Sequence, residues 1–344
     1  MNRSSLDRIH TQILWDRLLA VVEEQAQTLV RTAFSTTVRE AGDISAGVFD
    51  TKGRMLAQAV TGTPGHVNAM AASVGFFLKK FPIDSLHPDD VLLTNDPWYG
   101  TGHLNDFTVI TPVFKNGRPV ALFAATSHIA DVGGLGFGPD GRQVFEEGLN
   151  IPMGYLFKAG EPNEVLLEIL RANVRDPRSA EGDLHSLAAC NRAGVHSLLE
   201  TLDEFGMDGL DGAGRMIIDN SRKAMLEEIR SLPFGRWTNT LRIDGYEEAV
   251  DLVCSLSISE SGIDVDFDGT SPVCSHGINV PLTYTQAYAS FGVRCVVGNT
   301  IPNNAGSLAV VRVTAPQGCI LNAPRPAAVS ARHAIGQMLS LIHI

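Results

Sequence analysis

The sequence predicts an α+β protein of mixed helices and β-hairpins, built in more than one lobe. Two observations support this class. Apolar residues recur at three- and four-residue steps near the start and in the middle of the chain, which indicates helices. The segment 90–130 has short apolar runs of β character, and apolar residues alternate with period two within 238–268. These helical and β patterns come in blocks rather than in steady alternation, which favours α+β over a regular parallel α/β arrangement.

The first hundred residues predict two helices and one hairpin. Residues 8–38 have helical periodicity throughout. Residues 46–58 form two short apolar runs around a glycine-containing turn, which is typical of a β-hairpin. Residues 67–80 are again helical, and Pro82 ends that helix because proline lacks the donor that a helix needs.

A second hairpin is predicted between residues 107 and 126. Its two apolar runs, 107–114 and 119–126, flank the dipeptide Asn116-Gly117, which is the strongest short-range hairpin signal. A glycine-rich loop follows at 132–138. It lacks the Lys-Ser/Thr pair of a phosphate-binding loop, so it does not indicate nucleotide binding.

The remaining chain predicts a helical middle and a β-rich end. Residues 163–231 are helical, with breaks at Pro177 and around 206–214. Residues 238–268 alternate as strands, 282–297 form a helix, and 308–313 form a strand.

Two domains and a short tail are expected from this order. Pro233 and Gly235 separate an N-terminal α+β domain, 1–232, which carries the hairpin, from a β-rich second domain, 233–338, which we expect to be incomplete. The final segment, 339–344, has no cap or stop signal and resembles a translated sequencing adapter, so we expect it not to be native.

Composition and charge exclude several classes of protein. The net charge is −11, and the longest basic run is Lys79-Lys80, which argues against nucleic-acid binding. No apolar run approaches the roughly 18 residues of a membrane span, and the first residues lack a signal-peptide core. The five scattered cysteines indicate reduced thiols and a cytoplasmic location.

Two His-x-x-Asp pairs flank the second hairpin and suggest a metal site. They are His103/Asp106 and His128/Asp131. In a hairpin with a two-residue turn, the residue numbers of directly opposed partners have a constant sum. For a turn at 116 and 117 this sum is about 233. Asp106 is therefore expected to face position 127 or 128, and His103 to face 130 or 131. Opposed Cβ atoms lie about 5 Å apart, close enough to share a cation.

The chemistry of these four side chains suits a divalent cation. Two imidazoles and two carboxylates can hold Mn²⁺, Fe²⁺ or Zn²⁺ and leave positions open for water or substrate. The alternative is a pair of surface histidines with hydrogen-bonded carboxylates at strand ends.

Other polar residues near the hairpin are candidates for catalysis. His66, at a helix start, is a candidate ligand or general acid/base, with a structural histidine as the alternative. Asp96, in a Thr-Asn-Asp-Pro turn, is a catalytic candidate, with an Asx-turn as the alternative. Glu40 and Asp43 follow a predicted helix end, where negative charge is unfavourable and a partner is expected.

The motifs, taken in order, resemble the signature blocks of the hydantoinase B/oxoprolinase family. The resemblance extends to about residue 338. The blocks are 40–45 (EAGDIS), 65–70 (GHVNAM), 94–97 (TNDP), 102–106 (GHLND) and 127–134 (SHIADVGG), followed by 182–184 (GDL) and 268–271 (DGTS).

The resemblance implies a division of labour between two kinds of subunit. The family includes the B-type subunit of ATP-dependent N-methylhydantoinase, the C-terminal part of 5-oxoprolinase and the alpha subunits of acetone and acetophenone carboxylases. A hydantoinase A-type ATPase subunit phosphorylates the small-molecule substrate, and the B-type subunit handles the activated intermediate in a hetero-oligomer. The motif match again places metal ligands at His103, Asp106, His128 and Asp131. Family members are usually longer than this chain.

Three functions remain open at this point. The first is hydrolysis of a cyclic amide, a hydantoin or 5-oxoproline, after phosphorylation by the partner. The second is ATP-dependent carboxylation of a ketone through a phosphorylated enol. The third, of a different class, is a non-catalytic scaffold for the ATPase, with the histidines and aspartates purely structural.

Overall fold

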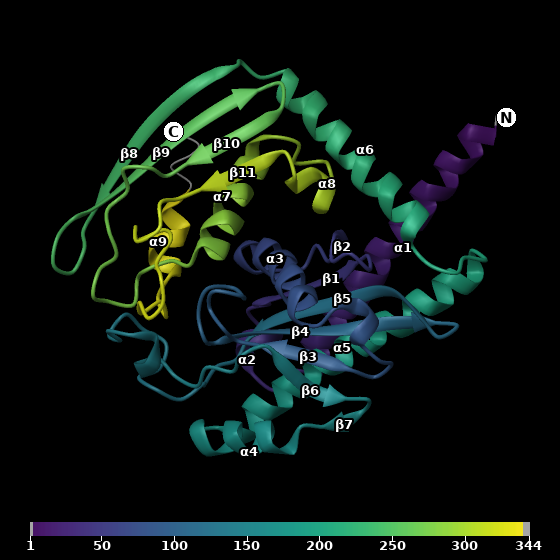
Figure 1. The fold of residues 1–344 in the computed structure, drawn as a ribbon, viewed down its shortest axis with the longest axis horizontal. Coiled ribbons are helices and arrows are strands. Elements are labelled where there is room, and N and C mark those ends of the chain that lie inside the picture. Colours follow the sequence, from purple (N-terminus) through teal and green to yellow (C-terminus); the bar gives the residue numbers. More distant parts are fainter. Residues whose placement is uncertain (1–2, 340–344) are drawn as a thin grey trace.

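The computed structural model describes residues 3–339 and contains two β-sheets (Figure 1). The larger sheet has the strand order β2-β1-β5-β4-β3-β6-β7, and each neighbouring pair is antiparallel. Its strands are β1 (Ile44–Phe49), β2 (Met55–Gln58), β3 (Val91–Thr94), β4 (Asp106–Lys115), β5 (Arg118–His128), β6 (Gly154–Lys158) and β7 (Glu161–Pro162).

The smaller sheet has the order β11-β10-β9-β8, with β10 and β11 parallel and the other pairs antiparallel. Its strands are β8 (Gly235–Ile243), β9 (Val250–Ser259), β10 (Gly262–Asp266) and β11 (Val311–Thr314). The helices are α1 (Arg3–Thr32), α2 (Thr36–Arg39), α3 (Pro64–Lys80), α4 (Glu164–Asn173), α5 (Pro177–Glu204), α6 (Asp211–Arg230), α7 (Leu282–Val296), α8 (Ala305–Leu308) and α9 (His333–Gly336). The α+β class is confirmed.

Helices cover both faces of the larger sheet, which explains why its central strands are almost wholly apolar. Along β5, Phe123 and Ala125 belong to the core formed with α1 and α5, whereas Leu122 and Ala124 belong to the core beneath α3. The period-two alternation therefore divides one strand between two hydrophobic cores.

Helices α3 and α7 pack against each other between the two sheets (Figure 1). A third hydrophobic cluster joins α7 to the smaller sheet and includes Met225 and Ile229 from the end of α6. The expected domain boundary, between residues 232 and 233, falls between the end of α6 and the start of β8. The division into two domains stays a prediction. The expected non-native tail lies, after Leu339, outside the described residues.

The predicted helix 8–38 is interrupted in the structure. It ends at Thr32 and restarts at Thr36, where the Ser35 side chain accepts a hydrogen bond from the Val38 N–H. The carboxylate of Asp183, in α5, accepts the N–H groups of Phe34 and Ser35 at 2.7 and 3.2 Å. A tertiary contact therefore stabilises a break that local periodicity cannot reveal.

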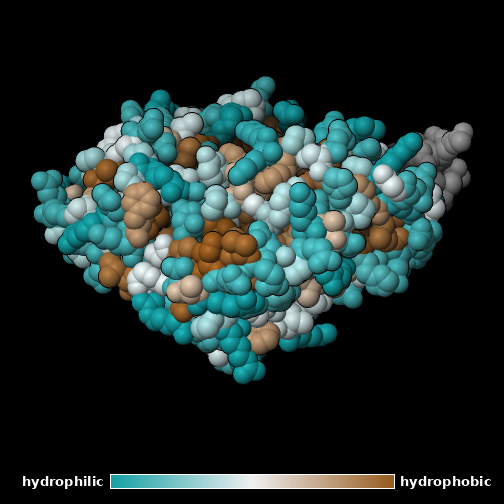
Figure 2. Space-filling model, turned by 60° about the horizontal axis from the view of Figure 1, so that its bottom comes forward, coloured by the Kyte–Doolittle hydropathy of each residue, from teal (hydrophilic) through white to brown (hydrophobic). Residues whose placement is uncertain are grey.

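The face of the molecule drawn in Figure 2 is mostly hydrophilic. Figure 2 shows one face, on which a compact hydrophobic patch is surrounded by hydrophilic residues. Within residues 3–339, no helix is long and apolar enough to cross a membrane.

Candidate metal centre

The β4–β5 hairpin places Asp106 directly opposite His128. Near the turn, Phe114 pairs with Pro119, as a sum of 233 requires. A register shift between Val113 and Phe114 then adds one residue, so every later pair sums to 234. The prediction that Asp106 faces position 127 or 128 is confirmed.

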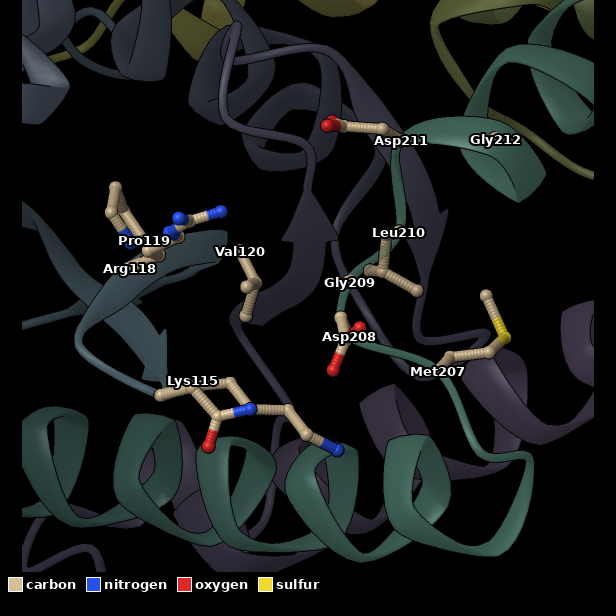
Figure 3. Close-up of a pocket in the computed structure, with 11 residues that line it drawn as sticks. Lys115, Arg118, Pro119, Val120, Met207, Asp208, Gly209, Leu210, Asp211 and Gly212 are labelled. Atoms are coloured by element: carbon tan, nitrogen blue, oxygen red, sulfur yellow. The ribbon is translucent and has the colours of Figure 1, made fainter.

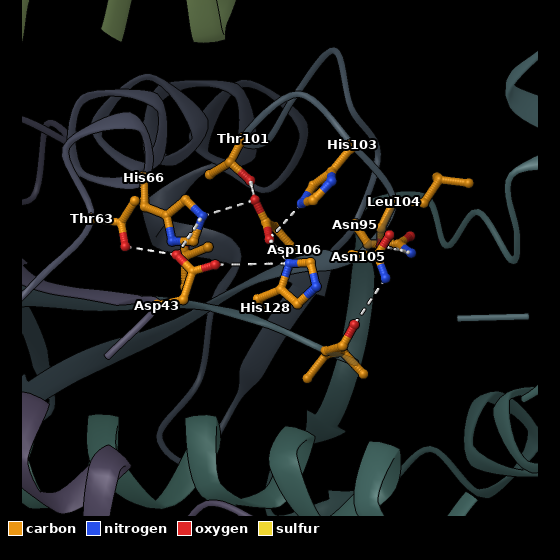
Figure 4. A network of polar contacts seen from close by, with 12 residues as sticks. Asp43, Thr63, His66, Asn95, Thr101, His103, Leu104, Asn105, Asp106 and His128 are labelled. Atoms are coloured by element: carbon orange, nitrogen blue, oxygen red, sulfur yellow. Dashed lines mark hydrogen bonds and ion pairs between the residues drawn. The ribbon is translucent and has the colours of Figure 1, made fainter. Parts of the chain in front are cut away.

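Three side chains converge at this end of the hairpin (Figure 4). One ligand atom from each of His103, Asp106 and His128 lies within 4.8 Å of the others, and all three residues are buried. Asp106 Oδ1 lies 2.7 Å from His103 Nε2 and 3.1 Å from His128 Nδ1. Two imidazole nitrogens therefore face the same carboxylate oxygen.

The other oxygen of Asp106 is held by three donors. Asp106 Oδ2 accepts from Thr101 Oγ1 at 2.5 Å, and it lies 2.9 Å from His66 Nε2 and 2.6 Å from Arg332 Nη2. Burial alone would raise the pKa of Asp106, but the positive charges of His66 and Arg332 hold it well below its usual value. Asp106 is therefore a fixed carboxylate with one oxygen anchored and the other turned to the imidazoles.

His103 is held as a neutral imidazole. Its Nδ1 lies 3.1 Å from the carbonyl oxygen of Ser330, which can only accept, so Nδ1 carries the proton and Nε2 carries the lone pair. Burial, and then the positive charge of Arg332, lower the pKa of His103 to about 3.

This arrangement fits a cation. His103 Nε2 lies within 2.7 Å of Asp106 Oδ1 but makes no hydrogen bond among the described residues. A lone pair facing a carboxylate oxygen at that distance is repulsive unless a cation lies beside both. A metal-bound histidine commonly donates its other N–H to a carbonyl, as His103 does to Ser330.

His66 and Asp43 border the same cluster. His66 Nε2 lies 3.4 Å from Asp43 Oδ1, and Asp43 also accepts from Thr63 Oγ1 at 2.6 Å. Burial alone would lower the pKa of His66, but the charges of Asp106 and Asp43 raise it above the usual value. The partner expected for Asp43 at its helix end is therefore the histidine cluster, with His128 Nδ1 3.9 Å away.

Asp131 is not brought into this group. Its carboxylate accepts the N–H groups of Gly133 and Asp176 at 3.0 and 3.2 Å and pairs with the Arg175 side chain at 2.8 Å. The expected pairing of His103 with position 130 or 131 does not form, because β5 ends at His128 and β4 begins only at Asp106. Asp131 instead holds the base of the glycine-rich loop.

Asp96 is also placed away from the three converging side chains. Its Oδ1 accepts the Trp98 N–H at 3.0 Å, which is an Asx-turn contact, and its Oδ2 pairs with Arg325. The Arg325 guanidinium lies 4.6 Å from the centre of the Trp98 ring. Asp96 thus ties the β3–β4 connection to a distant loop.

Several residues of the centre had no signal in the sequence. A cavity of about 400 Å³ adjoins the histidines and is also lined by Phe137, Tyr284, Arg332 and His333. The Arg332 guanidinium lies 4.1 Å from the centre of the Tyr284 ring, and Phe137 stacks on His333 with ring centres 5.1 Å apart. These residues come from distant segments and match no local motif.

A second cavity, of about 630 Å³, lies at the opposite end of the hairpin (Figure 3). It is bordered by Lys115 and Arg118, which flank the turn, and by residues 207–212, from the α5–α6 connection and the start of α6. Lys115 is already paired with Asp203. Among the residues that the structure describes, no histidine or cysteine lines this cavity, so the metal-ligand chemistry belongs to the smaller one.

The chain belongs to the hydantoinase B/oxoprolinase family, whose model matches residues 7–342. It is 29% identical to 5-oxoprolinase 1 of Arabidopsis thaliana, over 94% of this chain and 28% of that protein. It is 26% identical to a protein of a Pseudomonas species named as the B-type subunit of a D-/L-hydantoinase, over 97% of this chain and 60% of that protein.

Solved structures share the fold. The ATP-dependent caprolactamase of Pseudomonas jessenii superposes with a TM-score of 0.88 at 24% identity, covering 97% of this chain and 58% of that one. Nucleotide-free acetone carboxylase gives 0.87 at 19% identity, covering 94% and 46%. The chain therefore spans between about a quarter and three fifths of the length of these relatives.

Proposed function

We propose that this chain is the metal-holding subunit of an ATP-dependent enzyme that opens a cyclic amide of the hydantoin or 5-oxoproline kind. The observation that carries the proposal is the convergence of His103, Asp106 and His128 within 4.8 Å beside a cavity, in a chain of this family. The names of the two curated relatives, a 5-oxoprolinase and a hydantoinase subunit, support this substrate class.

The proposed ligands are His103 Nε2, Asp106 Oδ1 and His128 Nδ1, and the proposed metal is Mn²⁺, Fe²⁺ or Zn²⁺. Three protein ligands would leave positions open for water or a carbonyl oxygen. When bound, such a metal would polarise a carbonyl group and lower the pKa of water. The carboxylate supplies one negative charge, and the anchored Oδ2 keeps it in place.

His66 is the proposed general acid. Its Nε2 is engaged by Asp106, whereas its Nδ1 has no hydrogen-bond partner among the described residues, and the residue lines the cavity. Its raised pKa means that it keeps a proton to higher pH than a free histidine does. A proton on His66 Nδ1 could be donated to the amide nitrogen of the substrate as the C–N bond of the cyclic amide breaks. This transfer would neutralise the negative charge that develops on that nitrogen.

The use of ATP is assigned to a separate hydantoinase A-type ATPase subunit, which makes the enzyme a hetero-oligomer. The relative named as a B-type hydantoinase subunit supports this assignment. We also propose a cytoplasmic location, since all five cysteines are free thiols in the structure.

The test is reconstitution of this chain with a hydantoinase A-type ATPase subunit. We expect ATP-dependent ring opening of a hydantoin, of 5-oxoproline or of caprolactam, lost in His128→Ala and retained in His185→Ala, an exposed control. If ATP is consumed only in the presence of a ketone and bicarbonate, the enzyme is a carboxylase and the proposed hydrolysis is wrong. Ring opening that survives His128→Ala would reduce the centre to a structural role.

A further inference from the structure

A second buried carboxylate, Glu147, lies behind the metal centre and contacts none of its proposed ligands directly. Only 2% of Glu147 is exposed. Its Oε1 accepts two successive backbone N–H groups, from Val329 at 2.7 Å and from Ser330 at 2.8 Å. Burying a carboxylate costs free energy unless its interactions compensate for the lost hydration, so the contacts that Glu147 makes are expected to matter for the structure or the function.

The anchored segment, residues 328–333, is here called the strap. The strap lies against the metal centre. The Ser330 carbonyl oxygen accepts a hydrogen bond from His103 Nδ1 at 3.1 Å. The Ala331 N–H, which belongs to the same peptide unit, donates to the Gly277 carbonyl oxygen at 2.7 Å. The carbonyl that fixes the His103 proton is therefore set by the position of the strap.

The surroundings of Glu147 leave it little freedom to move. A Cβ added to Gly141 or Gly277 would lie 3.0 Å from its side chain, which is tighter than ordinary van der Waals contact. Its Oε2 has no partner among the described residues. Only Oε1 makes hydrogen bonds, and both of them hold the strap.

We propose that Glu147 is a positioning residue that, by anchoring the strap, keeps His103 in the tautomer whose unprotonated Nε2 faces Asp106. The inference rests on the proposed metal-binding role of His103. A histidine held in the other tautomer would present an N–H to the metal and could not bind it. Outer contacts of this kind commonly alter metal affinity 10- to 100-fold.

The experiment measures the His103 tautomer directly. Long-range ¹H–¹⁵N NMR spectra of the metal-free protein, with the His103 signals assigned through His103→Gln, distinguish a protonated Nδ1 from a protonated Nε2. We expect the Nδ1–H form in the wild type and in Glu147→Gln, whose amide oxygen can accept the same two N–H groups. In Glu147→Ala we expect a mixture of tautomers and Zn²⁺ binding weakened 10- to 100-fold.

Two further variants keep the test decisive. Glu146→Ala, at the exposed neighbouring residue, should leave the tautomer and the Zn²⁺ affinity unchanged. Glu147→Asp withdraws the carboxylate by one methylene and serves if Glu147→Ala does not fold. An unchanged tautomer and unchanged Zn²⁺ affinity in a folded Ala or Asp variant would overturn the inference. If the wild type has the Nδ1–H tautomer, altered in these variants, but binds no metal, the proposed function fails while the positioning role stands.

Discussion

At the scale of single residues, Asp106 determines the charge balance of the centre. It is the carboxylate closest to Arg332, which is itself only 3% exposed. A buried charge that loses its partner is strongly destabilising, because water cannot replace the lost contact. The two residues are 226 positions apart, so their contact also joins distant parts of the chain.

We expect Asp106→Asn to lower the free energy of unfolding by about 3–5 kcal/mol, because it leaves the Arg332 charge unpaired. Urea denaturation of the metal-free protein measures this change. Asp264→Asn is the matched control, since Asp264 pairs with Arg312 at the surface and should cost less than about 1 kcal/mol. Equal effects of the two substitutions would show that the buried pair is not important for stability.

The raised pKa of Glu147 predicts that the free energy of unfolding depends on pH. Burial raises its pKa from 4.5 to about 7, so the folded state favours the protonated form. The stability that protonated Glu147 contributes is therefore fully present below pH 4.5 and is lost as the pH rises through about 7. A shift of this size corresponds to about 3 kcal/mol.

The measurement compares unfolding free energies of the wild type and Glu147→Gln at pH 5 and pH 8. The stability of the variant relative to the wild type should increase with pH, because glutamine does not ionise. A relative stability that is the same at both pH values would contradict the raised pKa.

At the scale of elements, the β4–β5 hairpin was predictable because its information is local. Asn116 and Gly117 both have positive φ, 52° and 74°, as the turn between two antiparallel strands requires. The bulge at Val113/Phe114 was not predictable, since no special residue marks it. It is nevertheless the bulge that sets Asp106 opposite His128 rather than Ser127.

Gly117→Ala should lower the unfolding free energy by about 1 kcal/mol, through left-handed backbone strain alone. An added Cβ there meets nothing within 4 Å, so no steric clash contributes. Zn²⁺ affinity should not change, because the turn lies at the other end of the hairpin from Asp106. Gly212→Ala, equally open but without positive φ, is the control. A large loss of Zn²⁺ affinity in Gly117→Ala would mean that the turn, not the strand pairing, fixes the register.

At the scale of the whole molecule, the centre combines segments that no local pattern connects. The histidines and Asp106 come from motifs near the hairpin and could be found in the sequence. Arg332 and the Ser330 carbonyl come from the strap, and Glu147 comes from the long loop after the hairpin. Tertiary packing of α3 on α7 brings these parts together, and periodicity cannot specify such a contact.

Gly65→Ala tests this packing. An added Cβ would lie 2.3 Å from a Tyr288 ring carbon and 2.8 Å from one of Tyr284, so the α3–α7 contact must open. We expect a loss of about 1–3 kcal/mol in unfolding free energy. Gly75→Ala, on the same helix with nothing within 4 Å, should be neutral or stabilise by up to about 1 kcal/mol. Similar effects at both positions would argue against close packing of the two helices.

The central claim is that His103, Asp106 and His128 together bind one divalent metal ion. The most direct measurement is the metal content of the full-length chain after equilibration with Mn²⁺, Fe²⁺ or Zn²⁺ and removal of excess ion. We predict one equivalent in the wild type and in His185→Ala, with loss of the metal in His103→Ala and His128→Ala. Absence of metal from the folded wild-type protein, or its full retention in both histidine variants, would contradict this account.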